Sequence, residues 1–327
     1  MSDILDLLIV GGGPTGINIG VEAKKAGLRY LIVEKGVLTN SLFHFPANMT
    51  FFSTSKNLEI VDIPFISHTD KPTRREALEY YRRIVESYQL NIHFYEEVKE
   101  MKRGNNGLYD ISTARSTYRA HNVVVATGFY DQPRMLDVPG EELPKVKHYY
   151  DEAHPYVGQN ILIVGAANSA CDVALETWQK GANVTMAIRG SELYDRVKYW
   201  ILPNIKNRIK EGSIPAYFNT RLTKITESTV ELETPEGMVT LDNDFVLAMT
   251  GYKPDYKLMV QLRVPLTTDA AKKPDYNENT LETTESGLYV AGVLNAGMLT
   301  SKLFIENTRH HAGLIVNHIK SKVKTTA

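Results

Sequence analysis

Glycines at a fixed spacing occur at two places in the chain, and each set is able to bind a phosphate group. The first set reads Gly11-x-Gly13-x-x-Gly16 and lies between an apolar run and a helical pattern. Such glycines let the backbone turn tightly and approach a pyrophosphate, which rests on the free amides of the helix N-terminus. Glu34 follows about 20 residues later, where a carboxylate binds the ribose hydroxyls of an adenosine. The first set therefore predicts a dinucleotide site.

The second set reads Gly165-x-Ala167-x-x-Ala170 and also separates an apolar run from a helical pattern. Alanine at its middle position slightly limits how closely the backbone can come to a phosphate. Arg189 stands at nearly the same offset as Glu34 does in the first set. A guanidinium there pairs with a 2′-phosphate, which favours NADPH over NADH. A solvated surface arginine is the alternative interpretation, and Lys198 is a weaker candidate for the same phosphate.

Two nucleotide sites of opposite terminal charge indicate a flavoprotein. We expect one site to hold resident FAD and the other to admit NADPH, because hydride transfer needs both ring systems close together. Ala126-Thr127-Gly128 and Met249-Thr250-Gly251 each follow an apolar run. Their matched placement predicts the segments on which the chain crosses between two nucleotide domains, although a coincidence of turns is the alternative.

The elements that must position these residues form a βαβ unit that is used twice. The sequence predicts strands and helices at 5–10, 14–25 and 30–34, and again at 161–164, 169–179 and 183–188. The predicted domains are an FAD domain made of residues 1–130 plus 254–327 and an NADPH domain of residues 131–253. The first domain is therefore discontinuous.

Other segments have weaker local signals. Residues 39–71 show no sustained periodicity and are expected to be irregular and cofactor-facing. A capping box of Thr73 with Glu76 opens a helix, and residues 104–107 carry a hairpin signal. A last strand at 288–291 leads through Gly292 to a helix over about 302–319. The N-terminus of that helix either faces the flavin or simply begins an ordinary closing helix, within which His310 and His311 are expected to be surface or packing residues.

The composition excludes several classes of function. The chain has 327 residues, 43% of them hydrophobic, and a net charge of −1, which gives no electrostatic reason for nucleic acid or an anionic membrane as partner. No apolar run approaches the roughly 18 to 20 residues that cross a bilayer. Cys171 is the only cysteine, so no internal disulfide can form, and we expect a cytoplasmic protein in which Cys171 serves packing.

The whole chain resembles the low-molecular-weight thioredoxin-reductase-like flavoproteins. The shared strings are Gly-Gly-Gly-Pro at 11–14, Glu-Lys-Gly at 34–36, the two Thr-Gly segments, the second glycine set and residues 287–292. The resemblance implies an α/β fold with two Rossmann-like dinucleotide-binding domains, parallel sheets and β-meander additions. Thioredoxin reductases carry Cys-x-x-Cys where this chain has residues 148–152 without cysteine, so a conventional thioredoxin reductase is excluded. Val293 replaces their aspartate, which removes the usual hydrogen bond to the ribityl chain.

Within this superfamily the chain most resembles the bacillithiol-disulfide reductase family, through the strings at 49–55, 291–293 and 304–307. That resemblance implies an NADPH-dependent reductase of a low-molecular-weight thiol disulfide, a homodimer or larger oligomer, and Asn48 and Thr50 near the flavin. Thr15 stands where members of that family often have cysteine, so a mechanism that uses this thiol is unavailable. Either reduced flavin acts on the disulfide directly, or the substrate differs. No catalytic or metal-binding residue is predicted. The predicted cofactor-binding residues are Gly11, Gly13, Pro14, Thr15, Gly16, Glu34, Lys35, Asn48, Thr50, Thr127, Gly128, Gly165, Ala167, Asn168, Ser169, Ala170, Arg189, Lys198, Thr250, Gly251, Gly292 and Phe304.

Three alternatives to a disulfide reductase stay open. A ferredoxin- or flavodoxin-NADP reductase of the thioredoxin-reductase type also lacks the dithiol, and it would need a basic docking patch. A flavin monooxygenase or NADPH oxidase would consume oxygen rapidly. A redox-sensing flavoprotein would bind FAD with negligible turnover.

Overall fold

The computed structural model describes residues 4–325, which form two compact units. The chain passes out of the first unit at β7 (Gln132–Pro133) and returns at β16 (Tyr252–Lys253). Phe45–Asn48 lies inside the range 1–130 that the sequence assigns to the first domain, yet it belongs to the second unit because the Ala47 N–H donates to the Asp151 carbonyl, 2.8 Å away. The first unit comprises the residues up to His44, Met49–Gln132 and the residues from Tyr252 on, and the second comprises Phe45–Asn48 and Pro133–Gly251.

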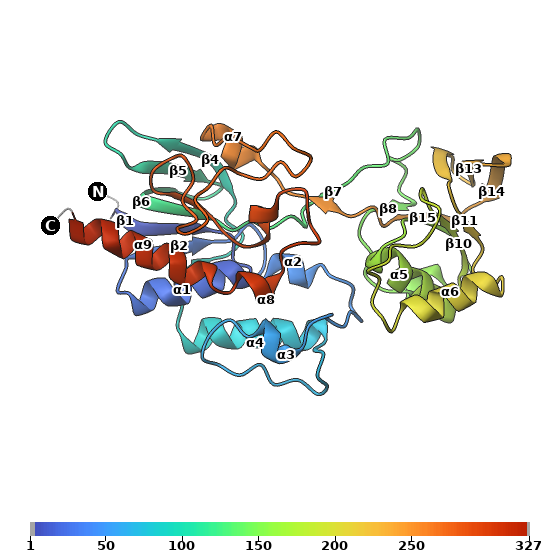
Figure 1. The fold of residues 1–327 in the computed structure, drawn as a ribbon, viewed down its shortest axis with the longest axis horizontal. Coiled ribbons are helices and arrows are strands. Elements are labelled where there is room, and N and C mark those ends of the chain that lie inside the picture. The colour runs from blue at the N-terminus through green and yellow to red at the C-terminus, as the bar shows by residue number, and fades with distance from the viewer. Residues whose placement is uncertain (1–3, 326–327) are drawn as a thin grey trace. The chain divides into compact units, whose positions relative to one another are not determined.

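A parallel sheet forms the centre of the first unit (Figure 1). β1 (Leu5–Val10) pairs with β2 (Tyr30–Val33) on one side and with β6 (Thr117–Val125) on the other. β3 (Ile92–His93) pairs with β2, and β17 (Leu288–Val290) pairs with the second half of β6. The middle of β1 is completely buried, as expected for a parallel sheet that is covered on both faces.

An antiparallel hairpin extends this sheet. The first half of β6 pairs with β5 (Tyr109–Thr113), which pairs with β4 (Val98–Arg103). The predicted hairpin turn at residues 104–107 joins β4 to β5. The structure thus confirms the β-meander addition to a parallel sheet.

Helices cover the sheet and fill the long connection after β2. α1 (Pro14–Lys25) packs against β1 and β2. α2 (Asn40–Phe43) and α3 (Ser55–Leu58) are single turns within the segment predicted to be irregular. α4 (Arg74–Ser87) begins with the predicted capping box, in which the Thr73 side chain accepts from the Glu76 N–H and the Glu76 side chain accepts from the Thr73 N–H. Tyr80 is buried on its inner face, whereas Val85 and Tyr88 are only half-buried.

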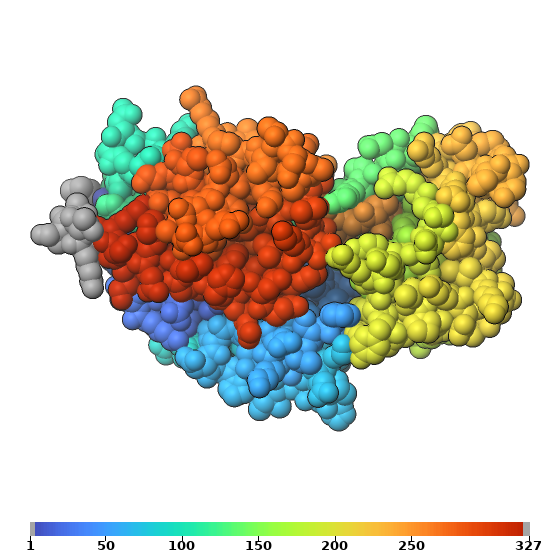
Figure 2. Space-filling view, viewed as in Figure 1, coloured from blue at the N-terminus to red at the C-terminus, as the bar shows by residue number. Residues whose placement is uncertain are grey.

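The C-terminal helix differs from the single helix predicted over 302–319. The chain forms α7 (Lys257–Gln261), the 3-10 turn η2 (Gly292–Ala296), the short α8 (Ile305–Thr308), and then α9 (His311–Thr325), which lies beside α1. The Thr308 hydroxyl donates to the Phe304 carbonyl four residues back, a bond that bends helices. In the space-filling view, the residues from Tyr252 on, in orange and red, form most of the visible face of the first unit (Figure 2).

The second unit repeats the parallel pattern on a smaller scale. Its sheet has the order β11-β10-β9-β15-β8, and α5 and α6 pack against each other. A separate antiparallel sheet of β12, β13 and β14 completes it. The predicted α/β class with two units built on parallel sheets is therefore confirmed. The bounds are β8 Val146–Lys147, η1 His154–Tyr156, β9 Asn160–Val164, α5 Asn168–Gln179, β10 Asn183–Ala187, α6 Leu202–Lys210, β11 Ala216–Tyr217, β12 Arg221–Ile225, β13 Thr229–Thr234, β14 Gly237–Asp242 and β15 Phe245–Ala248.

Candidate nucleotide-binding sites

Four strand ends meet at one edge of the sheet in the first unit. Val10, at the end of β1, lies in register with Val33 of β2 and Val125 of β6, and Val125 lies in register with Val290 of β17. The chain leaves β1 and β2 in one direction and β6 in the other, so the gap between β1 and β6 is a topological switch point. Dinucleotides bind outside the carboxyl ends of strands at such points.

The three glycines of the first set have different surroundings. Gly11 has φ +112°, and a Cβ there would lie 2.6 Å from the Ala126 carbonyl oxygen. A Cβ on Gly16 would lie 1.9 Å from the Gly11 carbonyl oxygen, so Gly16 allows α1 to pack against the turn. A Cβ on Gly13 would meet no atom within 4 Å. Among these three glycines, only Gly13 therefore has open space on its Cβ side, where a pyrophosphate can lie.

The beginning of α1 presents amides rather than a capping side chain. Gly13 is the N-cap residue and Pro14 follows it in the first turn, where a missing N–H costs nothing. No side chain caps this helix within the described residues. The first-turn amides and the positive end of the helix dipole suit an anion.

Glu34 is 6% exposed, and its carboxylate stabilises the first glycine turn by hydrogen bonds to backbone amides. One carboxylate oxygen accepts the Gly12 N–H at 2.7 Å and the other accepts the Gly36 N–H at 2.9 Å. Burial raises the pKa of Glu34 above its usual value, and the two backbone donors oppose that rise. Each oxygen keeps a lone pair that a ribose hydroxyl can use. Lys35 instead forms an ion pair with Asp131, with Nζ 2.8 Å from the carboxylate.

The segments after β6 and β17 contribute further groups to this edge. The Thr127 hydroxyl is buried and lacks a hydrogen-bond partner among residues 4–325. Gly128 and Gly292 both have left-handed φ values, +73° and +74°. A Cβ on Gly292 would lie 2.7 Å from Oγ1 of Thr15 at the start of α1. Open space next to Gly13, a buried acceptor at Glu34 and an unpartnered hydroxyl at Thr127 together fit the phosphates and ribose of a dinucleotide.

His311 lies at this edge, a position that the sequence interpretation missed. It is the first residue of α9 and not a mid-helix residue, it is 5% exposed, and its Nδ1 accepts the Gly292 N–H at 3.0 Å. Burial, together with a smaller effect of the neighbouring His310, lowers the pKa of His311 to about 4. No spacing in the sequence connects residues 292 and 311, so no local signal predicts this bond.

Three residues that the family resemblance suggests for cofactor binding have different surroundings. Asn48 belongs to the second unit, where its Nδ2 donates to Oε1 of Glu176 at 2.9 Å. Thr50 forms an isolated β-bridge with Thr73 in the first unit. Phe304 is the N-cap residue of α8 and is 45% exposed. Their contacts with a cofactor remain predictions.

The second unit has its own switch point between β9 and β15. Gly165 has φ +144°, and a Cβ there would lie 2.6 Å from the Met249 carbonyl oxygen at the end of β15. Ala167 is the N-cap residue of α5, where no side-chain cap is formed within the described chain. The Thr250 hydroxyl donates to the Arg134 carbonyl, and the Arg134 N–H donates to the Gly251 carbonyl, which fixes the turn that follows β15.

Asn168 anchors the loop after β10 to the beginning of α5. Its Oδ1 accepts the Lys198 N–H at 2.8 Å and its Nδ2 donates to the Arg196 carbonyl at 3.3 Å. Ser169 is exposed beside it, and Ala170 is buried, where its Cβ lies 3.1 Å from the Cβ position of Gly165. This loop therefore has a defined position relative to the second glycine set.

The cations of this loop are not equivalent. Nζ of Lys198 lies 2.7 Å from Asp172, whose pKa is raised by burial and lowered by that lysine. Arg189 is exposed directly after β10, and within residues 4–325 it makes no ion pair. Arg196, which the sequence interpretation did not select, is exposed on the same loop. Arg189 is thus an accessible cation just after β10, and its pairing with a 2′-phosphate stays a prediction.

Cys171 packs inside α5. It is completely buried, and its Sγ lies 3.8 Å from the Ala166 carbonyl oxygen. Burial, together with a smaller effect of the neighbouring Asp172, raises the pKa of the Cys171 thiol to about 12. The predicted packing role is confirmed.

A pair of glycine substitutions tests the first site. In Gly16→Ala the new methyl collides with backbone 1.9 Å away, so we expect little folded protein. In Gly13→Ala the methyl meets no protein atom but enters the space above the turn, so we expect a normal melting temperature and clearly less than one FAD per chain. Flavin absorbance and thermal unfolding check both. Full FAD content in Gly13→Ala would refute this position for the pyrophosphate.

The burial of Cys171 predicts an unreactive thiol. With a pKa of about 12, roughly one thiol in ten thousand is ionised at pH 8, and the sulfur is also inaccessible. We expect no reaction with a chromogenic disulfide reagent in native protein and one thiol per chain in denaturant. Rapid modification of the native protein with loss of activity would show that this thiol is functional.

Comparisons with known proteins agree with this geometry. The model of the pyridine nucleotide-disulphide oxidoreductase family matches residues 8–292. The chain is 39% identical to the bacilliredoxin reductase Bdr of Bacillus subtilis (strain 168), over 96% of this chain and 97% of that protein.

Two solved structures agree equally well over their whole length. The bacillithiol disulfide reductase Bdr of Staphylococcus aureus is 41% identical, with a TM-score of 0.95 and coverage of 98% of this chain and 99% of that one. The same enzyme from Bacillus cereus is 37% identical, with a TM-score of 0.95 and coverage of 98% and 100%. Family membership implies flavin and nicotinamide cofactors. The chain therefore belongs to the pyridine nucleotide-disulphide oxidoreductases and, among them, to the Bdr family.

Proposed function

We propose that this protein holds FAD in its first unit, binds NADPH at its second unit, and reduces the disulfide of a low-molecular-weight thiol. The observation that carries the proposal is the presence of two separate strand-edge sites of opposite charge. One has the buried carboxylate of Glu34, and the other has the exposed guanidinium of Arg189. Full-length similarity to bacillithiol disulfide reductases supports the choice of acceptor.

The overall reaction balances without a protein thiol. NADPH, one proton and one disulfide yield NADP⁺ and two thiols. FAD supplies the hydride-accepting and electron-donating chemistry between nicotinamide and disulfide. The chain's own residues bind and orient, with Glu34 and the first glycine set for FAD and Arg189 with the second glycine set for NADPH.

The absence of a second cysteine restricts the route of the electrons. Cys171 is the only cysteine and it is buried in the second unit, so a protein dithiol cannot relay electrons. Thr15, at the start of α1, has a hydroxyl that is a far weaker nucleophile than a thiolate. In the proposed reaction, bound FAD would supply the two electrons to the substrate disulfide, and no disulfide within this chain would form as an intermediate.

The expected setting is the cytoplasm, with a homodimer or larger assembly. No helix within residues 4–325 is long and apolar enough to span a membrane. The lone cysteine supports a reducing compartment. Light scattering on the purified holoprotein measures the size of the assembly.

A steady-state assay tests the function. Purified protein should be yellow, and NADPH should bleach the flavin without oxygen. NADPH oxidation should accelerate with bacillithiol disulfide and much less with oxygen, ferredoxin or cytochrome c. Rapid oxygen consumption would favour an oxidase or monooxygenase, ferredoxin reduction would favour a ferredoxin reductase, and negligible turnover with every acceptor would favour a redox sensor.

A charge reversal tests the nucleotide assignment. Arg189→Glu removes the cation and adds repulsion to the 2′-phosphate, so we expect KM for NADPH to rise by roughly 10- to 100-fold, about 1.4 to 2.8 kcal/mol, with little change for NADH. Arg221→Glu, at an exposed position on β12, is the matched control and should leave both values unchanged. Equal losses for the two nucleotides would contradict the assigned role of Arg189.

A further inference from the structure

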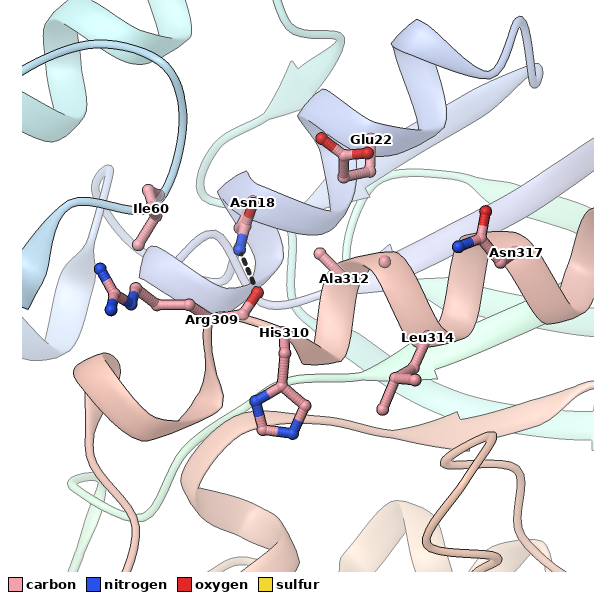
Figure 3. Close-up of a pocket in the computed structure, with 9 residues that line it drawn as sticks. Asn18, Glu22, Ile60, Arg309, His310, Ala312, Leu314 and Asn317 are labelled. Atoms are coloured by element: carbon pink, nitrogen blue, oxygen red, sulfur yellow. Dashed lines mark hydrogen bonds between the residues drawn. The ribbon is translucent and has the colours of Figure 1, made fainter.

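The junction between α8 and α9 is fixed by a side chain of α1. Asn18 is buried, and its Nδ2 donates to the Arg309 carbonyl at 2.8 Å (Figure 3). A continuous helix would use that carbonyl as the acceptor for residue 313. The guanidinium of Arg309 donates to the carbonyls of Lys56 and Glu59, at 3.4 and 3.1 Å. These bonds hold the chain at the point where α9 begins with His311.

The break orients two adjacent histidines differently. Figure 3 shows the ring of His310 pointing away from α1, on the surface of a groove of about 430 Å³. His311 is buried, and its ring is nearly perpendicular to that of His310, with the centroids 4.7 Å apart. Only His311 contacts the backbone of the strand edge, through Nδ1 and the Gly292 N–H.

The direction of this bond defines the state of the ring. A ring nitrogen that accepts a hydrogen bond carries no proton, so the neutral His311 ring has its proton on Nε2. Protonation would place an N–H against the Gly292 N–H and abolish the bond. The low pKa of His311 agrees with this neutral form.

Gly292 lies between β17 and the start of α1. The Ala291 N–H completes the pairing with the Val125 carbonyl at 3.0 Å, and the chain then turns at Gly292 with φ +74°. The turn lies so close to Thr15 that a Cβ on Gly292 would be 2.7 Å from Oγ1. Because the Gly292 N–H already donates to His311, it is not available to a ligand. Gly292 therefore contributes the shape of the turn.

We propose that His311 is a positioning residue for FAD, which holds the Gly292 turn against Thr15 in the shape that retains the cofactor. The inference rests on the proposed FAD site of the first unit and adds a residue to it. Without the Nδ1 acceptor, the buried Gly292 N–H either stays unpaired or turns toward water, and an unpaired buried donor is costly. Either outcome moves the turn that borders the site.

Four variants of the holoprotein test the role. His311→Asn places an amide oxygen near the position of Nδ1, whereas His311→Gln places its amide near Nε2 and His311→Leu has no acceptor. His310→Leu is the matched control on the exposed neighbour. The dissociation rate of FAD is measured as the rise of flavin fluorescence after dilution, and circular dichroism at saturating FAD measures stability.

We expect FAD to dissociate about tenfold faster from the Leu and Gln variants, equivalent to about 1.4 kcal/mol. The Asn variant and His310→Leu should stay within threefold of the wild-type rate. If the Leu variant does not fold, the contrast between Asn and Gln decides. A wild-type rate in the Gln variant, or equal acceleration in the Asn and Gln variants with an equal loss of stability, would overturn the positioning role. A wild-type protein that binds no FAD would instead overturn the proposed function.

Discussion

The parallel pairing of β1 with both β2 and β6 is the constraint on which the first site depends. Val10 pairs in register with Val33 and Val125, and Val125 pairs with Val290, so the segments after four strands leave the sheet at the same level. Because both faces of β1 are covered, a shift of one residue would place side chains of different size and shape in each packed position on both faces. The completely buried middle of β1 therefore fixes the register, and the register brings Gly11, Thr127 and Gly292 together.

The two units share the same arrangement of strand, glycine turn and helix, but the residue after the next strand is acidic in the first unit and basic in the second. Glu34 is buried and bonded to two backbone amides, so it is already oriented before a ribose arrives. Arg189 is exposed and has a flexible side chain, which must lose conformational freedom when it binds a phosphate. A rigid, buried acceptor suits a cofactor that stays bound, and an exposed cation suits one that is exchanged in each turnover. This difference gives a physical reason to assign FAD to the first unit and NADPH to the second.

Local patterns predicted much of this structure, because their physical causes are local. The strands and helices around each glycine set, the Thr73–Glu76 capping box and the hairpin turn at 104–107 depend on neighbouring residues. The break before α9 depends on Asn18, which is nearly 300 residues from its acceptor Arg309, and the role of His311 depends on Gly292. The packing of Phe45–Asn48 with the second unit is also non-local. Periodicity cannot predict such contacts, since it describes one segment at a time.

At two positions next to Gly292 in space or in sequence, this chain lacks the thiol or carboxylate that related flavoproteins carry. Thr15 replaces the common cysteine, and Val293 replaces the aspartate of thioredoxin reductases. His311, which contacts Gly292 from the other side, is neutral because burial disfavours its charged form. The side chains of these three residues therefore give the turn shape and hydrogen-bond geometry, and they do not supply a redox sulfur or a fixed charge. In the proposed reaction the reactive sulfur atoms therefore belong to the substrate, because the one cysteine of this chain is buried in the second unit.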